Sequence, residues 1–263
     1  DFITAPEISF LFSEIIAIWI ISFWEHLDKP KNFNIIELGP GNGLLINVMI
    51  KTFKKFPEFF NSSKIYMYEK SKKLEIIQKK LLGKEDIKWV KNFDLIKKGP
   101  VIFFGNEFFD AIPIKQFLRK ENLLLEKHYA IFKKREIKEI YKKASKIDVN
   151  QVKNFTSLKN LKFFEFPKLG FKELDKMITK ITKLKGGLIF IDYGYLGSIN
   201  KSTLQSVRRH KKNNLLENLG KADITSLVNF DLLGEYLKKN SLKVKKVSSQ
   251  KFFLERMGII ERA

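Results

Sequence analysis

The sequence predicts an α/β fold in which a central sheet has helices on both faces and carries an inserted antiparallel β meander. Residues 33–55 have the pattern of a strand, a glycine turn and a helix, and further apolar runs of strand length alternate with helical patterns after them. The alternation stops at residues 116–141, where short apolar segments are separated by Lys and Glu. The first pattern is typical of a βα core and the second of a meander. The sequence therefore indicates one large domain with an elaboration.

Composition indicates a folded chain and excludes several kinds of chemistry. The 263 residues are 44% hydrophobic, which is enough to bury a large core and argues against disorder. There is no cysteine, so disulfides, thiolate metal sites and cysteine nucleophiles are excluded, and no metal site is predicted. This composition suits a reducing compartment. The chain begins at Asp1 and not at Met, so we expect the natural N-terminus, with any targeting peptide, to be missing.

The net charge of +21 would ordinarily indicate a nucleic acid or another anionic partner. Only six of the 50 basic residues are arginine, however, and the lysines are spread along every predicted helix. RNA-binding proteins more often present arginine forks and exposed stacking aromatics. We therefore interpret the charge as a solvated surface and predict no specific nucleic-acid partner.

The first predicted helix starts at Thr4, where Thr4 and Glu7 form a capping box with Pro6 in the first turn. Its apolar pattern continues to Phe23 and is almost long enough to span a membrane. Glu14 in the middle argues against a lipid environment. We therefore predict a buried helix packed over the sheet, and no membrane span.

Three glycines alternate in the turn after the first strand, at Gly39, Gly41 and Gly43, and Glu37 precedes them. Glycine adopts backbone angles closed to other residues and lets a cofactor lie against the backbone. A dinucleotide fingerprint would need a glycine where Leu44 stands. The spacing instead resembles the first motif of class I methyltransferases, which use S-adenosylmethionine (SAM). The alternative is a turn that only closes the connection between strand and helix.

A second strand is predicted at residues 64–69 and ends at Glu69. A carboxylate at the tip of that strand can accept hydrogen bonds from both hydroxyls of a ribose, as it does in dinucleotide-binding folds. The alternative is a surface acid without a ligand. The helix that follows, at residues 71–82, is expected to turn Leu74, Ile77 and Leu81 inward, and a short strand is expected at residues 87–90.

The strand predicted at residues 99–105 ends in a dense group of polar and aromatic side chains. Asn106, Glu107, Phe108, Phe109 and Asp110 follow it directly. Open α/β sheets place their sites at the carboxyl ends of strands, so this group is well placed for chemistry.

The rest of the chain completes the sheet after the meander. A Lys- and Asn-rich link is expected at residues 142–160, then a helix at 169–184 and a strand at 186–191 that leads into Asp192. Residues 202–210 and 220–225 have the composition of polar loops, and from Phe230 we expect a helix and then two strands, around Val244 and Phe252. The predicted division assigns residues 1–115 to the first part of the core, 116–168 to the insertion and 169–263 to the completed sheet.

Longer motifs extend the resemblance over nearly the whole chain. They lie at residues 1–9, 37–43, 106–113, 191–195, 204–210, 223–225 and 253–259. Together they look like the MidA-like methyltransferase family, which includes a mitochondrial complex I assembly factor of the arginine methyltransferase type. The resemblance implies a Rossmann-like class I methyltransferase sheet with SAM as methyl donor. It also implies methylation of arginine on a protein, with symmetric dimethylation as the product. For the mitochondrial member the protein is a subunit of respiratory complex I.

The resemblance and the residue positions together predict the site. Glu37, the three glycines and Glu69 are expected to bind SAM. Glu107 and Asp110 are expected to hold the substrate guanidinium between two carboxylates, with Asn106 orienting the substrate nitrogen or SAM. Five further residues are expected on the substrate side: Phe108, Phe109, Tyr193, Arg208 and His210.

Several alternatives stay open at this point. Asp110 could serve only to cap a turn. The chain could be a non-enzymatic assembly factor that has kept the fold, or a methyltransferase for a different protein or for RNA. We favour the cytoplasm if the chain is bacterial and expect the mitochondrial matrix if it is eukaryotic.

Overall fold

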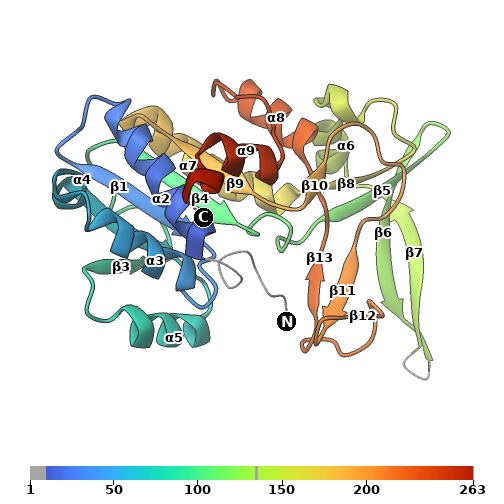
Figure 1. The fold of residues 1–263 in the computed structure, drawn as a ribbon. Coiled ribbons are helices and arrows are strands. Elements are labelled where there is room, and N and C mark those ends of the chain that lie inside the picture. The colour runs from blue at the N-terminus through green and yellow to red at the C-terminus, as the bar shows by residue number, and fades with distance from the viewer. Residues whose placement is uncertain (1–9, 134–135, 263) are drawn as a thin grey trace. The chain divides into compact units, whose positions relative to one another are not determined.

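The computed structural model describes residues 10–133 and 136–262 (Figure 1). The described chain forms two compact units. The parallel-sheet unit comprises residues 10–108, 175–191 and 246–262, and the antiparallel unit comprises residues 109–174 and 192–245 apart from the gap. The three-part division expected from the sequence stays a prediction.

Five parallel strands form the sheet of the parallel-sheet unit, in the order β3-β2-β1-β4-β9. Every residue of the central strand β1 is buried, which is why its sequence does not alternate between apolar and polar residues. The strands are β1 (Phe33–Leu38), β2 (Ser63–Tyr68), β3 (Ile87–Val90), β4 (Val101–Asn106) and β9 (Gly186–Ile191). The sheet predicted from the sequence is thereby confirmed.

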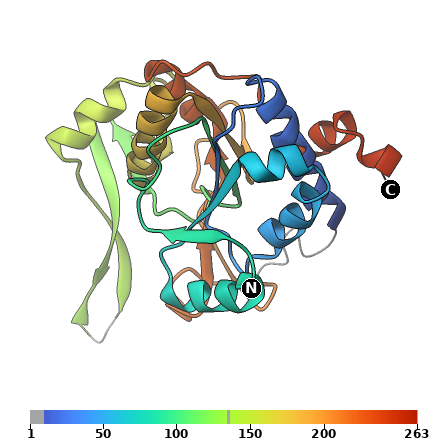
Figure 2. The same ribbon diagram turned by 90° about the vertical axis from the view of Figure 1, so that its left-hand side faces the viewer.

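Helices cover both faces of this sheet (Figure 2). On one face, Ile16 of α2 and Met49 of α3 join Ile35 of β1 in the main hydrophobic core. On the other, Lys180 in the second half of α7 donates a hydrogen bond of 3.0 Å to the carbonyl of Ile96. The helices of the unit are α2 (Phe10–Glu25), α3 (Leu44–Phe53), α4 (Pro57–Ser62), α5 (Lys72–Leu82), part of α7 (Lys168–Leu184), α9 (Gln250–Arg256) and α10 (Ile259–Arg262).

The first predicted helix is present as α2, and the capping box proposed at Thr4 and Glu7 lies outside the described residues. α2 is fixed to the core by large side chains. The ring of Trp24, for example, meets that of Phe59 edge-on, with centroids 5.4 Å apart. None of the helices in the described part of the chain is long and apolar enough to cross a membrane.

The antiparallel unit contains the predicted meander. β5, β6 and β7 follow one another, and β8 pairs with β5, which gives a four-stranded sheet in the order β7-β6-β5-β8. A three-stranded sheet, β12-β11-β13, and the pair β10-β14 complete the unit. Its strands are β5 (Lys115–Lys120), β6 (Leu123–Ile131), β7 (Ile137–Lys143), β8 (Phe163–Phe166), β10 (Gly194–Tyr195), β11 (Gln205–Arg208), β12 (Lys211–Asn213), β13 (Asp223–Thr225) and β14 (Val228–Asn229).

Aromatic rings form much of the core of this unit. Phe171 of α7 stacks on Tyr236 of α8 (Phe230–Lys239), with ring centroids 3.9 Å apart. Phe171 also meets Phe166 of β8 edge-on at 5.3 Å, and Phe155 stacks on Phe171 at 5.5 Å. These contacts hold the meander, α7 and α8 together by burying large rings.

Three expectations from the sequence were wrong, all of them after residue 141. The link at residues 142–160 contains α6 (Lys146–Lys153) and the short 3₁₀ helix η2 (Thr156–Leu158). The signal was present, since Ser145 caps α6 by accepting a hydrogen bond from the N–H of Asp148 at 3.1 Å. The supposed polar loops at 202–210 and 220–225 contain β11 and β13. β11 also pairs with β12, where Asn213 donates a hydrogen bond of 3.0 Å to the hydroxyl of Ser206. The facing side chains are polar here, so no apolar alternation marks these strands.

The third error concerns the C-terminal tail. No strand forms around Val244 or Phe252 within the described residues, and residues 250–256 form the helix α9. Ser249 caps α9 by accepting a hydrogen bond from the N–H of Phe252 at 3.2 Å. Apolar residues at Phe252, Phe253 and Leu254 therefore belong to helix turns and not to a strand, because a good N-cap precedes them.

Candidate functional site

The glycine turn follows β1, and its three glycines all have positive φ angles: +60° at Gly39, +54° at Gly41 and +87° at Gly43. A β-carbon on Gly39 would lie 3.1 Å from the ring of Phe108, and one on Gly43 would lie 3.3 Å from Leu82. A β-carbon on Gly41 would meet no described atom within 4 Å. Gly39 and Gly43 thus allow close packing within the protein, whereas Gly41 borders open space.

Glu37 comes just before this turn, in β1, and it is 2% exposed. Its Oε2 atom accepts no hydrogen bond from the residues that the structure describes. Burial, and to a smaller extent the charge of Glu69, raise the pKa of Glu37 well above its ordinary value. A buried carboxylate oxygen without a donor is costly, which fits a site that a positively charged or hydrogen-bonding ligand completes.

Glu69 follows β2 and is also buried. Its Oε1 accepts a hydrogen bond of 2.7 Å from the N–H of Ser71, and its Oε2 accepts one of 3.1 Å from Nε2 of Gln78. A carboxylate can accept about four hydrogen bonds, so each oxygen retains capacity for a ligand hydroxyl.

Gln78 was not singled out in the sequence, and it connects the two parts of this site. Its side chain is fully buried, and its Nε2 also donates a hydrogen bond of 2.7 Å to the carbonyl of Gly41. The expected inward face of α5 was wrong in part. Ile77 and Leu81 are 43% and 42% exposed, and the buried positions are Gln78 and Leu82. No signal in the sequence marked Gln78, because a glutamine on a helix is usually exposed.

The end of β4 supplies the residues predicted for catalysis in the parallel-sheet unit. Asn106 is the last residue of β4 and pairs with Ile191 of β9. The N–H of Glu107 donates to the carbonyl of Ile191 at 2.8 Å, and Glu107 has a left-handed φ of +53°. Phe108 stacks on Phe190 with centroids 6.3 Å apart, and its ring is the group that a β-carbon on Gly39 would meet. Left-handed backbone at a residue other than glycine is strained, and such strain is frequent at functional sites.

Asp110 belongs to the antiparallel unit, where it has an acidic neighbour that the sequence analysis did not assign to the site. Burial raises the pKa of Asp110 to about 6. Burial, followed by the charge of Asp110, raises the pKa of Asp192 to about 7. Asp192 accepts hydrogen bonds from the N–H of Phe109 at 2.7 Å and from that of Tyr193 at 3.1 Å. Asp192 therefore fixes the backbone at Phe109, and it is close enough to Asp110 to be affected by the charge of that carboxylate. Its position directly after a buried strand was the available signal.

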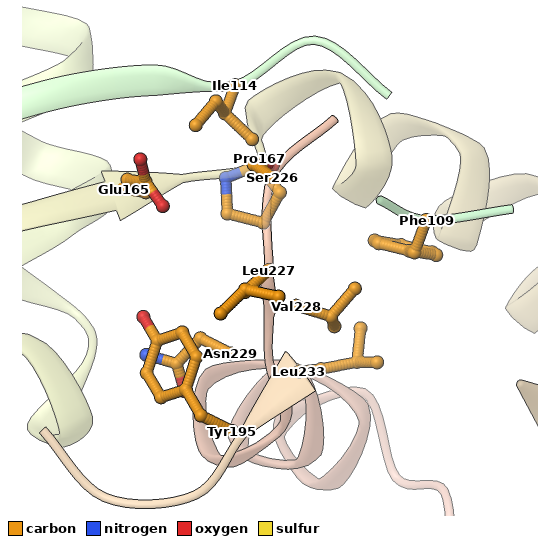
Figure 3. Close-up of a pocket in the computed structure, with 10 residues that line it drawn as sticks. All are labelled: Phe109, Ile114, Glu165, Pro167, Tyr195, Ser226, Leu227, Val228, Asn229 and Leu233. Carbon is orange, nitrogen blue, oxygen red and sulfur yellow. The ribbon is translucent and has the colours of Figure 1, made fainter. Parts of the chain in front are cut away.

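A cavity of about 20 Å³ lies in the antiparallel unit, next to Phe109 (Figure 3). Tyr195 and Glu165 lie at the end of this cavity opposite Phe109, and burial followed by the charge of Glu165 raises the pKa of Tyr195 to about 12. Glu165 is already bonded to Gln116 at 2.8 Å and to the N–H of Thr203 at 3.0 Å. Because a single water needs roughly 10–15 Å³, this cavity is too small for an amino-acid side chain. Phe109 is buried and lines this cavity, and its expected role toward a substrate stays a prediction.

The other residues expected on the substrate side also lie in the antiparallel unit. Tyr193 is 60% exposed, and its carbonyl accepts a hydrogen bond from the N–H of Val228 at 2.8 Å. Arg208 ends β11 and donates to Asn218 at 2.6 Å. His210 is exposed in the turn between β11 and β12, where its φ is +61°. The expected role of these side chains toward a substrate stays a prediction.

Residues 15–248 match the model of a family described as putative S-adenosyl-L-methionine-dependent methyltransferases. The chain belongs to this family. The resemblance predicted from the motifs is confirmed, and the cofactor expected at the glycine turn is the one that the family's description names. The glycine turn, Glu37 and Glu69 are thus the candidate SAM site of a family member.

Similar proteins include mitochondrial protein arginine methyltransferases. The NDUFAF7 homologue of Caenorhabditis elegans is 28% identical over all of this chain and 66% of its own length. Human NDUFAF7 is 27% identical over 98% of this chain and 64% of its own length. The chain thus spans just under two thirds of the curated relatives that it matches.

Two crystal structures from Burkholderia thailandensis share the fold. One of them is bound to S-adenosyl-homocysteine and superposes with a TM-score of 0.80 at 20% identity. The match covers all of this chain and 69% of the other chain. The other, a native crystal structure, gives a TM-score of 0.82 at 19% identity, and the match covers all of this chain and 71% of the other chain. They establish the fold, including the additional antiparallel part.

Proposed function

We propose that this protein is a SAM-dependent methyltransferase that acts on arginine side chains of a protein. The observation that carries the proposal is the open space at Gly41, with Glu69 joined to the same turn through Gln78. Close by in the sequence, Glu37 has a buried carboxylate oxygen to which none of the described residues donates a hydrogen bond. The family match supports SAM as the cofactor, and the names of the relatives support arginine as the substrate.

The residues of this site fit the groups of SAM. Glu37 suits the positively charged amino group of the methionine part, because its buried Oε2 needs a donor. The backbone at Gly41 leaves room for the cofactor, and Glu69 suits the two ribose hydroxyls. When bound, SAM supplies a methyl group on a sulfonium, which is reactive toward a nitrogen held in line with it.

The substrate side depends on carboxylates. An arginine guanidinium remains protonated near neutral pH, so acids are needed to bind it and to accept the proton that leaves when a methyl group is added. Glu107 stays our proposed residue for orienting the guanidinium, with Asn106 beside it in the sequence. Asp110 is proposed as the acceptor of the leaving proton, with Asp192 as its partner, because both have pKa values raised toward neutrality.

The finer description of the substrate comes from the resemblance. We propose a subunit of respiratory complex I as the target and symmetric dimethylation as the product. The named relatives are mitochondrial proteins, which supports the mitochondrial alternative for this chain if it is eukaryotic. A bacterial cytoplasmic location stays a prediction from the sequence.

Calorimetric titration with SAM tests the cofactor, and a methyl-transfer assay on cell extracts, with the products identified by mass spectrometry, tests the reaction. We expect one SAM site per chain and new methylarginine on a protein. Absence of SAM binding would contradict the proposal. Binding without any methyl transfer would instead support the second function, that of a non-enzymatic assembly factor that has kept the cofactor site.

A further inference from the structure

Gln78 lies where the glycine turn, the acid after β2 and strand β3 meet. Its amide takes part in three hydrogen bonds: Nε2 donates to the carbonyl of Gly41 at 2.7 Å and to Oε2 of Glu69 at 3.1 Å, and Oε1 accepts from Nε1 of Trp89 at 2.9 Å. The side chain has no exposed surface. Both hydrogens of the amide and its oxygen are therefore occupied inside the protein.

These partners fix the orientation of the amide. If the amide were turned over, its oxygen would face the carbonyl of Gly41 and the carboxylate of Glu69, and its NH₂ group would face the indole N–H of Trp89. Acceptors would then face acceptors and a donor would face a donor, all without access to water. Trp89 thus makes Gln78 present its two hydrogens to Gly41 and Glu69.

We propose that Gln78 is the positioning residue that gives this site its specificity for ribose. By bonding to Oε2 of Glu69, while the N–H of Ser71 bonds to Oε1, it holds the carboxylate in one orientation. By also donating to the carbonyl of Gly41, it fixes the position of that carboxylate relative to the glycine turn, which borders the open space. The remaining lone pairs of Glu69 then accept hydrogen bonds from the two hydroxyls of a ribose. This inference rests on the proposed SAM site.

The inference is tested with S-adenosyl-homocysteine (SAH) and its 2′-deoxyribose analogue as calorimetric probes. The parent protein should bind SAH tighter than the analogue by about tenfold or more, since a buried acceptor built for a hydroxyl is left unpaired by the analogue. Gln78→Met keeps the length of the side chain and removes its hydrogen bonds. It should weaken SAH binding by about tenfold or more and reduce the preference over the analogue to about threefold or less.

A second variant separates positioning from mere packing. Gln78→Glu has the same shape, but when it is ionised it places a second carboxylate against Glu69. It should lose about tenfold or more in SAH affinity at pH 8 and regain most of it at pH 5.5, where the new acid is protonated and again donates a hydrogen bond. The charged groups around this position are Glu37, Glu69, Glu75, Lys79 and Lys91. Because the same groups are present in the parent, the readout is the ratio of variant to parent affinity at each pH.

Two controls complete the experiment. Gln151→Glu makes the same chemical change on an exposed position of α6 and should leave SAH affinity unchanged. Trp89→Phe removes only the donor that orients the amide, and it should lower SAH affinity in the same direction as Gln78→Met but by less, even if Gln78→Met does not fold. The inference is overturned if folded Gln78 variants bind SAH like the parent, if Gln78→Glu does not recover at pH 5.5, or if Gln78→Met keeps the full preference for ribose. A parent that does not bind SAH would refute the proposed function itself.

Discussion

The buried acids of the two units differ in how their oxygens are satisfied. In the parallel-sheet unit, Glu37 is buried with an oxygen that has no described donor, and its pKa is raised well above its ordinary value. In the antiparallel unit, Asp148 is just as buried, but Lys168 at 2.6 Å, Lys115 at 2.9 Å and the Ser145 hydroxyl surround it and lower its pKa to about 2. Burial alone therefore does not mark a functional acid. A buried acid that lacks donors indicates a ligand, and one that is surrounded by cations stabilises the fold.

The largest expected effect tests the open space at Gly41. Gly41→Val should weaken SAH binding by about a hundredfold or more, because the side chain would occupy the space left for the cofactor. The matched control is Gly197→Val in the antiparallel unit, where φ is +82° and a β-carbon also meets no described atom within 4 Å. Both changes strain the backbone, so only a difference in SAH affinity, measured by calorimetry on folded protein, reports the site. Equal affinity of the two variants would remove the glycine turn from the proposal.

The next effect concerns Glu107, whose carboxylate we place on the substrate side. Glu107→Gln removes the charge and keeps the shape, so SAH binding should be retained. Methyl transfer should fall by about a hundredfold or more, which corresponds to roughly 2.7 kcal/mol of transition-state stabilisation. Rates are measured with saturating SAM and read by mass spectrometry. Transfer at the parent rate would show that Glu107 is structural.

A smaller effect is expected for stability at Asp148. The folded pKa of this carboxyl, about 2, is below that of an unfolded aspartate, so the group adds stability above about pH 4 and loses it as the pH falls toward 2. Asp148→Asn should therefore lower the free energy of unfolding at pH 7 by about 2 kcal/mol, with a difference that shrinks toward pH 2.

Urea unfolding across this pH range measures the effect, and the exposed Asp94→Asn is the control. A constant difference between Asp148→Asn and the parent at all pH values would mean that its ion pairs are not the cause.

An effect of opposite sign is expected at Asp110. Its folded pKa, about 6, lies above that of an unfolded aspartate, so the folded state binds the proton more tightly and loses stability as the pH rises from about 4 to 7. Asp110→Asn should be more stable than the parent at pH 8 by about 3 kcal/mol and equally stable at pH 4, while methyl transfer falls by about tenfold or more. If stability drops at pH 8 and the rate per folded molecule does not, Asp110 only caps a turn.

The SAM side of the proposed site could be predicted from the sequence because its signals are local. Positive φ angles are needed at Gly39, Gly41 and Gly43 whatever the rest of the chain does, and acids at the ends of β1 and β2 are brought to one edge by any parallel sheet. Gln78 was missed because a glutamine on a helix is usually exposed. Only the rotation of α5, with Leu82 in the core, shows that it faces inward.

The sequence by itself determined the parallel βα core, the inserted meander and the candidate cofactor residues, because apolar period, glycine spacing and strand ends are properties of short segments. Tertiary structure alone decided that Asp192 accompanies Asp110, that Phe109 lines a small cavity, and that residues 205–225 form a sheet from polar strands. Those outcomes depend on which segments meet across long stretches of chain. They also depend on which buried carboxylates have hydrogen-bond donors nearby. Neither can be predicted from a pattern within a short segment.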